Sequence, residues 1–277
     1  MLYYILRPFV NILLKFLTKR ITITGLENIP KSGAVILASN HSNSFLDAAI
    51  IGCNIDRRMW SLGRGDIFKK PLARKILSSF FMLPVHRLSE GKEYLSGNDE
   101  TFSNCIELFK KGEVVLIFPE GICTNQTKLL PLKKGASRLA QQAWNEGIDL
   151  KIVPIGIAYH SFTTFGKIIH FNVGKTIEKA DFESISEDGF FIKDFNELLT
   201  KKMTALQNWS FTNIDSGQNL IFSITSILFF PANFLAEKIS RKMTKGSVFF
   251  DSVMLGLLVV IMPIYWFLVV YFICSVI

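Results

Sequence analysis

The sequence has few of the residues that build disulfide frameworks, metal centres and serine-hydrolase sites. Its four cysteines are Cys53, Cys105, Cys123 and Cys274, and they show neither CxxC nor metal-ligand spacing. Such cysteines indicate reduced thiols that face the cytoplasm. There is no Gly-x-Ser-x-Gly motif, so an acyl-enzyme intermediate on serine is not expected. Neither a bound metal nor an internal repeat is predicted.

Charge and apolar content narrow the classes of partner. The 277 residues are 49% hydrophobic, include 25 phenylalanines and carry a formal net charge of +8. This length suits one α/β domain with appendages. The apolar residues gather at the two ends of the chain. Positive charge beside apolar ends indicates an anionic membrane surface or phosphate-bearing substrates, and no nucleic-acid partner is expected.

The segment from Ala34 to Ile51 predicts a buried strand, a polar turn and a helix. His41 then lies at the carboxyl end of a strand, where ligands gather in α/β sheets. With Asp47 it can form a base and its orienting carboxylate. On one continuous helix the two would point about 240° apart, so they meet only if His41 lies in the turn. The alternative is that His41 caps a helix or fills a polar pocket, and that Asp47 is a solvated acid in the first helical turn.

Three later stretches place chemistry-bearing residues beside predicted strands or helices. Arg87 follows the apolar residues 81–85, where its guanidinium could clamp a phosphate or form a surface salt bridge. Glu120 and Gly121 end a strand over 114–118, at the same sheet edge as His41. Lys133 and Lys134 open a helix over 136–145, which predicts either an anion site or a solvated basic loop.

The predicted fold is α/β, with a mixed, mostly parallel sheet flanked by helices. Further strands are expected at 57–62, 150–158 and 168–173, and Pro154 indicates an edge strand or a bulge. We expect three parts: a membrane-interface helix at 1–20, a catalytic domain at 21–212 and membrane-embedded helices at 217–277.

Both terminal segments are expected to contact a membrane. Residues 1–17 predict an amphipathic helix with a polar stripe of Arg7, Asn11 and Lys15, which lies in an interface or packs on the domain. Residues 252–277 are apolar over about 26 residues, more than a span requires. We expect this last segment to span or insert shallowly, and the shorter 219–236 to be interfacial or re-entrant. The basic link between them favours the cytoplasmic side, and we expect a bacterial inner membrane with the catalytic domain facing the cytoplasm.

Four blocks of sequence, taken in order, resemble the glycerolipid (PlsC-like) acyltransferase family over about residues 20–210. The blocks are Asn40-His41 to Asp47, Arg87, Phe118-Pro119-Glu120-Gly121 and Val153-Pro154-Ile155-Gly156-Ile157. The resemblance implies that His41 is the general base, that Asp47 orients it, and that Arg87, Glu120 and Gly121 bind the acceptor. It also implies that the co-substrate is a thioester of coenzyme A or acyl carrier protein, with no bound cofactor. The expected reaction makes phosphatidate from lysophosphatidate, a lysolipid acceptor.

The chain departs from the family pattern in two places. Five residues separate His41 from Asp47 where the family usually has four, so we expect a bulge to restore the geometry. Ile122-Cys123-Thr124 stands where the family usually has Thr-Arg-Ser. Lys133 or Lys134 could replace the missing arginine, or the acceptor could be glycerol 3-phosphate or an amino-acid lysolipid. A non-catalytic lipid-binding protein and a membrane hydrolase are the alternatives of other classes.

An acyl transfer to a hydroxyl also needs hydrogen-bond donors for the oxyanion that develops on the thioester carbonyl. Backbone amides near His41 or Gly121 are the predicted donors.

Overall fold

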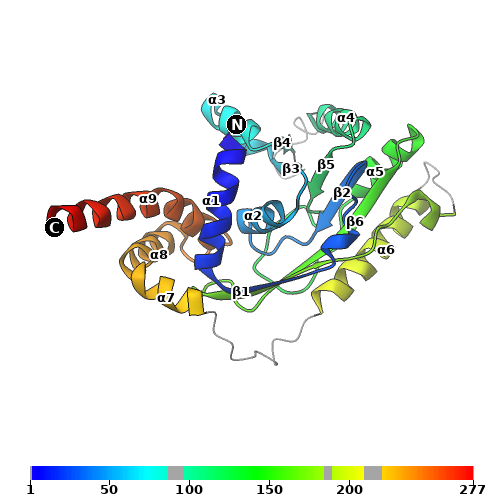
Figure 1. The fold of residues 1–277 in the computed structure, drawn as a ribbon. Coiled ribbons are helices and arrows are strands. Elements are labelled where there is room, and N and C mark those ends of the chain that lie inside the picture. The colour runs from blue at the N-terminus through cyan, green and yellow to red at the C-terminus, as the bar shows by residue number, and fades with distance from the viewer. Residues whose placement is uncertain (1, 87–96, 184–188, 209–219, 277) are drawn as a thin grey trace.

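A seven-stranded sheet forms the centre of the computed structural model, which describes residues 2–86, 97–183, 189–208 and 220–276 (Figure 1). The strands are β1 (Thr18–Thr24), β2 (Ala34–Ser39), β3 (Met59–Arg64), β4 (Met82–Val85), β5 (Val114–Ile117), β6 (Leu150–Tyr159) and β7 (Lys167–Val173). Their order across the sheet is β1-β7-β6-β2-β5-β3-β4. Neighbouring strands run parallel, except that β6 and β7 are antiparallel. The predicted mixed, mostly parallel α/β fold is therefore confirmed.

Strand β2 shows why the central strands are apolar throughout. All of its residues are buried, because successive side chains point to opposite faces of the sheet and both faces are covered. Val35 and Leu37 enter one hydrophobic cluster, and Ala34, Ile36 and Ala38 enter the other. A continuous apolar run is the composition that such a doubly covered strand needs.

The helices divide between the two faces of the sheet. They are α1 (Leu2–Leu17), α2 (Phe45–Asn54), α3 (Pro71–Ser79), α4 (Gly97–Lys110), α5 (Gly135–Asn145), α6 (Gly189–Gln207), α7 (Leu220–Leu228), α8 (Phe230–Thr244) and α9 (Phe250–Val276). Short 3-10 helices occur at Leu26–Asn28, Gly65–Phe68 and Lys179–Asp181. Helices α1, α2, α8 and α9 contribute to the hydrophobic cluster on one face, and α4, α5 and α6 to that on the other (Figure 1).

Strand β6 decides between the two alternatives, an edge strand or a bulge, that Pro154 left open. The strand is central, because it pairs with both β2 and β7. Its ladder with β7 begins at Ile155, opposite Val173, whereas Ile152 forms an isolated bridge with Ile177. Pro154 lies at this one-residue change of register, so the strand accommodates the missing N–H as an irregularity and not as an edge.

Helix α1 packs on the domain and also leaves an apolar surface exposed. Leu13 and Leu14 are each 1% exposed within the core, whereas Tyr4, Ile5 and Ile12 are exposed. The predicted polar stripe is not uniformly solvated, because the Arg7 guanidinium donates to the backbone oxygen of Ile55. An exposed apolar face of this kind suits contact with a lipid surface.

The carboxyl-terminal region forms two short helices and one long one. The apolar stretch at 219–236 is divided, because α7 ends at Leu228 and α8 begins at Phe230. Among the described residues, α9 is the helix that is long and apolar enough to cross a membrane. Its first half is buried at Met254, Leu258 and Met262, and most of its residues from Pro263 onward are exposed. Figure 1 shows this second half extending away from the sheet.

Candidate active site

His41 lies in the turn between β2 and α2 and faces Asp47 of α2. Its Nδ1 is 3.0 Å from Asp47 Oδ2. Because an ionised carboxylate only accepts hydrogen bonds, this contact places the ring proton on Nδ1 and leaves Nε2 as the acceptor. The imidazole stacks on Phe118, with ring centroids 3.9 Å apart and planes 13° apart. The two residues are brought together, with His41 in the turn as the spacing requires.

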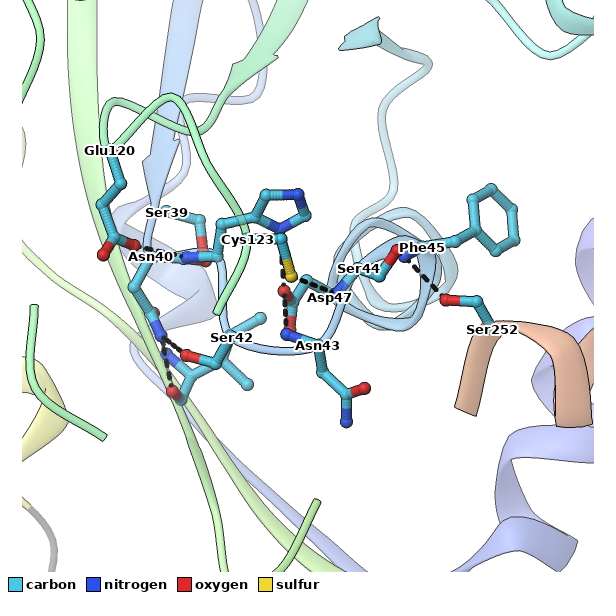
Figure 2. A network of polar contacts seen from close by, with 12 residues as sticks. Ser39, Asn40, Ser42, Asn43, Ser44, Phe45, Asp47, Glu120, Cys123 and Ser252 are labelled. Carbon is cyan, nitrogen blue, oxygen red and sulfur yellow. Dashed lines mark hydrogen bonds and ion pairs between the residues drawn. The ribbon is translucent and has the colours of Figure 1, made fainter. Parts of the chain in front are cut away.

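Asp47 is held as a fully buried acceptor with bonds at both oxygens. Its Oδ2 also accepts from the Asn43 amide at 2.8 Å (Figure 2). Its Oδ1 accepts from the Tyr159 hydroxyl at 2.5 Å. Burial, and then the nearby Asp47 carboxylate, raise the pKa of Tyr159 well above its ordinary value, so Tyr159 remains a donor. Asp47 therefore has its donors in place before any substrate binds.

Ser44 accommodates the additional residue between His41 and Asp47. Its backbone has φ 49° and ψ −131°, a conformation that non-glycine residues rarely adopt. The chain thus forms a sharp turn at Ser44, and α2 starts at the next residue, Phe45. The Ser44 amide donates to Cys123 Sγ at 3.0 Å. Cys123, in the altered triplet after Gly121, therefore supports the turn.

Asn40 ties the end of β2 to β6. Its side-chain Nδ2 donates to the Ile157 oxygen at 2.9 Å, and its Oδ1 accepts from the Ile157 amide at 2.7 Å. Nδ2 also donates to Ser42 Oγ at 2.9 Å (Figure 2). Asn40, the residue before His41, is therefore held in place at the end of β2 by its hydrogen bonds to β6.

Glu120 lies beside the turn and accepts hydrogen bonds from two backbone amides. Its Oε1 accepts from the His41 amide at 2.7 Å and its Oε2 from the Leu130 amide at 2.8 Å. Burial raises its pKa, and the two amide donors oppose that rise. Glu120 thus connects the polar loop at 122–134 to His41. Its predicted contact with the acceptor stays a prediction.

The amides of His41 and Gly121 already have partners within the protein, and donation to the oxyanion by amides near them stays a prediction. The His41 amide donates to Glu120, and the Gly121 amide donates to the Phe118 oxygen at 3.0 Å. Both donors are committed within the protein, so neither is available to a reacting carbonyl. Gly121 instead serves the turn: its φ is +72°, and an added Cβ would lie 3.1 Å from Lys133 Cγ.

Lys133 and Lys134 lie at the start of α5 with exposed side chains. The Lys133 amide donates to the Pro119 oxygen at 2.7 Å, which holds this lysine beside Gly121. The structure therefore brings Lys133 to the edge of the site formed by His41 and Glu120. The other predicted phosphate ligand, Arg87, lies outside the described residues.

An apolar groove opens between α1 and α2, next to the turn. Its lining residues are Tyr3, Leu6, Arg7, Val10, Phe45, Ala48, Ala49, Gly52, Cys53, Met59, Ser61, Phe80 and Met82. Phe45 belongs both to this groove and to the first turn of α2. Burial raises the pKa of the Cys53 thiol to about 11, so this cysteine is protonated and behaves as a small apolar group.

Sequence reasoning did not single out Tyr159 or Asp251, although both are part of the polar network around the turn. Tyr159 ends β6 at the sheet edge where His41 lies. This position at a strand end could have indicated that Tyr159 lies near His41. Asp251 immediately precedes the apolar run at 252–277, and a carboxylate there gave no sign of a partner near His41. Both contacts depend on the three-dimensional order of strands and helices.

Comparison with known proteins identifies the class to which this architecture belongs. Residues 20–158, half of the chain, match the family model described as Acyltransferase. The chain therefore belongs to the acyltransferase family, and the resemblance to glycerolipid acyltransferases inferred from its motifs is confirmed.

Individual relatives agree with this assignment. The chain is 30% identical to a chloroplastic 1-acyl-sn-glycerol-3-phosphate acyltransferase of Arabidopsis thaliana over 49% of this chain and 35% of that protein. It is 28% identical to the 1-acyl-sn-glycerol-3-phosphate acyltransferase of Bacillus subtilis over 42% of this chain and 53% of that protein. The chain thus matches only about a third to a half of these relatives' lengths. The crystal structure of the acyltransferase PlsC from Thermotoga maritima shares the fold, with a TM-score of 0.55 and 19% identity over 75% of this chain and 81% of that one.

Proposed function

We propose that this acyltransferase esterifies lysophosphatidate to phosphatidate, with a fatty acyl thioester of coenzyme A or acyl carrier protein as donor. The observation that carries the proposal is the 3.0 Å contact between His41 Nδ1 and Asp47 Oδ2 at the end of β2. The relatives named as 1-acyl-sn-glycerol-3-phosphate acyltransferases support this acceptor.

His41 acts as the general base of the proposed reaction. Its Nε2 takes the proton of the lysolipid hydroxyl as the hydroxyl oxygen attacks the thioester carbonyl. The tetrahedral intermediate then breaks its carbon–sulfur bond, and the imidazolium returns the proton to the departing thiolate. Asp47 stays ionised and stabilises the imidazolium. A positioned base of this kind contributes on the order of 10² to 10⁴-fold to the rate.

Two surfaces beside the turn suit the two ends of a lysolipid. The exposed ammonium groups of Lys133 and Lys134 supply positive charge for a phosphate. The groove between α1 and α2 offers an apolar lining for an acyl chain, and it shares Phe45 with the turn. We keep Arg87 as a phosphate ligand and Glu120 and Gly121 as parts of the acceptor site on the basis of the motif alone.

Membrane association is part of the proposal. The second half of α9 exposes apolar side chains such as Ile264, Phe267 and Phe272, which is unfavourable in water and favourable in a bilayer. The basic residues on α8, including Lys238 and Lys242, favour a cytoplasmic position beside anionic lipid. A bacterial inner membrane with the catalytic domain in the cytoplasm fits both features.

The altered triplet Ile122-Cys123-Thr124 favours a second candidate for the acceptor. The arginine that usually follows Glu-Gly in the family is missing here, and its absence weakens phosphate recognition. Glycerol 3-phosphate and an amino-acid lysolipid are therefore the alternative acceptors. A protein that binds lipid without turning it over is the alternative of another class.

Acyl transfer by the purified protein in detergent tests these proposals. Labelled acyl-coenzyme A and acyl carrier protein are each offered with lysophosphatidate, glycerol 3-phosphate and an amino-acid lysolipid. We expect phosphatidate formation by the wild type, its loss in His41→Ala and Asp47→Asn, and its retention in His160→Ala, whose histidine is exposed. If another acceptor is preferred, that acceptor replaces lysophosphatidate in the proposed reaction. Lipid binding without transfer to any acceptor would overturn the enzymatic proposal.

A cysteine introduced at Lys245 tests the orientation. Labelling by an impermeant reagent only from the cytoplasmic side is expected, and labelling only from outside would contradict it.

A further inference from the structure

The first turn of α9 contacts the chain between His41 and Asp47, here called the catalytic turn, at two points. Asp251 Oδ2 accepts a hydrogen bond from Asn43 Nδ2 at 2.6 Å. Ser252 Oγ accepts from the Phe45 amide at 3.0 Å, and Figure 2 shows this bond reaching across to the ribbon of α9. Phe45 is the first residue of α2, and its amide belongs to the unpaired donors at a helix start. A hydroxyl from a distant helix therefore caps α2.

A buried ion pair fixes the position of Asp251. Lys167 Nζ lies 3.2 Å from Asp251 Oδ2, and both side chains are less than a tenth exposed. Lys167 also donates to the Ser161 oxygen at 3.1 Å. Burial lowers the pKa of Lys167, and the Asp251 carboxylate opposes that change. The charged groups have committed partners, which is the arrangement that makes a buried pair geometrically specific.

The contacts continue from Asp251 to the catalytic pair. Asn43, whose side chain bonds to Asp251, donates through its backbone amide to Asp47 Oδ2 at 2.8 Å. The same Asp47 oxygen faces His41 Nδ1 at 3.0 Å. A shift of Asn43 therefore moves a donor on the oxygen that orients the imidazole.

We propose that Asp251 is a positioning residue for the His41–Asp47 pair, acting through Asn43 and assisted by Ser252. Helix α9 lies beyond residues 20–158, so this support comes from outside the part of the chain that matches the family model. It compensates for the five-residue spacing, because Asn43 and Phe45 flank the strained Ser44. The expected effect on turnover rests on the proposed function, whereas the expected effect on the imidazole does not.

Kinetic variants test the proposal first. Asp251→Ala removes the acceptor of the Asn43 bond and is expected to lower kcat roughly ten- to hundredfold, with KM for both substrates little changed. Asp251→Asn keeps an acceptor oxygen and is expected to retain more of kcat. The matched control is Met254→Ala, which removes buried packing one turn further along α9 without touching Asn43. Its kcat, corrected for folded protein, is expected to stay at the wild-type value.

A chemical probe tests the position of the imidazole without relying on turnover. Diethyl pyrocarbonate modifies accessible neutral imidazoles, and peptide mass spectrometry gives the rate at each histidine. We expect faster modification of His41 in Asp251→Ala than in the wild type or Met254→Ala. The rate at the partly exposed His86, which follows β4 on the side of the sheet away from β7, is the internal reference. An unchanged His41 rate in Asp251→Ala, or an equal increase in Met254→Ala, would overturn the proposal.

The two readouts separate the possible failures. If the wild type transfers no acyl group but Asp251→Ala still accelerates His41 modification, the proposed function fails and the positioning role stands. If transfer occurs and Asp251→Ala leaves both kcat and the modification rate unchanged, the positioning role fails alone.

Discussion

Ser44 is the residue at which a substitution gives the clearest test of how the longer His41-to-Asp47 spacing is accommodated. The angles φ 49° and ψ −131° lie outside the left-handed helical region that non-glycine residues sometimes occupy. The Ser44 side chain makes no capping hydrogen bond to α2. Replacing Ser44 with glycine therefore removes the steric conflict of the Cβ and loses little else.

The size of the effect follows from two opposing contributions. Holding a residue in such a conformation costs about 1–3 kcal/mol. Glycine also gives the unfolded chain more freedom, which costs about 0.4–1 kcal/mol. Ser44→Gly is therefore expected to raise the free energy of unfolding by about 1 kcal/mol. For a protein of this size, that raises Tm by roughly 2–4 °C.

Thermal unfolding of the purified protein in detergent, followed by circular dichroism, measures this difference. Ser44→Ala is the matched control, because it removes the hydroxyl but keeps the Cβ and hence the strain. Its Tm is expected to stay near that of the wild type. The amide of residue 44 still donates to Cys123 in both variants, so that contact does not distinguish them.

A Tm for Ser44→Gly that does not exceed that of Ser44→Ala would refute the reasoning. It would mean that the turn is unstrained, and that the additional residue between His41 and Asp47 is accommodated without a conformational cost.

Three further outcomes are expected from the structure. Tyr159→Phe removes a donor to the buried Asp47 and should lower the free energy of unfolding by about 1.5–3 kcal/mol, measured as a fall in Tm. Burial raises the pKa of Glu120 above 4.5, so the folded state binds this proton more tightly than the unfolded state does. The stability of the wild type relative to Glu120→Gln should therefore fall as pH rises from 4.5 through the raised pKa. A difference in Tm between the two proteins that does not depend on pH would contradict this. Ending the chain at Trp266 keeps the contacts of Tyr265 and Trp266 with Phe229 and removes the exposed residues that follow. This variant should leave a smaller share of the protein in the membrane fraction with Tm little changed, and its unfolding would contradict the prediction.

The sheet was largely predictable because its strands are short apolar runs that end in small or polar residues. The apolar run at 34–38 correctly predicted β2, and the end of that run correctly placed His41 at the edge of the sheet. Pro154 left an edge strand or a bulge open, and the structure shows a central strand whose register with its neighbours changes at the proline. The angle at Ser44 was not predictable in detail, because nothing in its identity specifies a positive φ.

The partners of the turn that contains His41 could not be predicted for a different reason. Tyr159 and Asp47 are 112 residues apart, and Asn43 and Asp251 are 208 apart. Such contacts depend on which strands and helices become neighbours, and local periodicity holds no information on that. For the same reason, Glu120 was placed correctly at the sheet edge, but its bonds to the His41 and Leu130 amides were not foreseen.

The separation between Asn43 and Asp251 also has a consequence for protein synthesis. At about 5–20 residues per second, the ribosome adds Asp251 roughly 10–40 s after it has added Asn43. During that interval the nascent sheet can form, but the turn that contains His41 lacks its partners on α9. The turn that contains His41 therefore gains its contacts with Asp251 and Ser252 only after the ribosome has synthesised the start of α9, the last helix described.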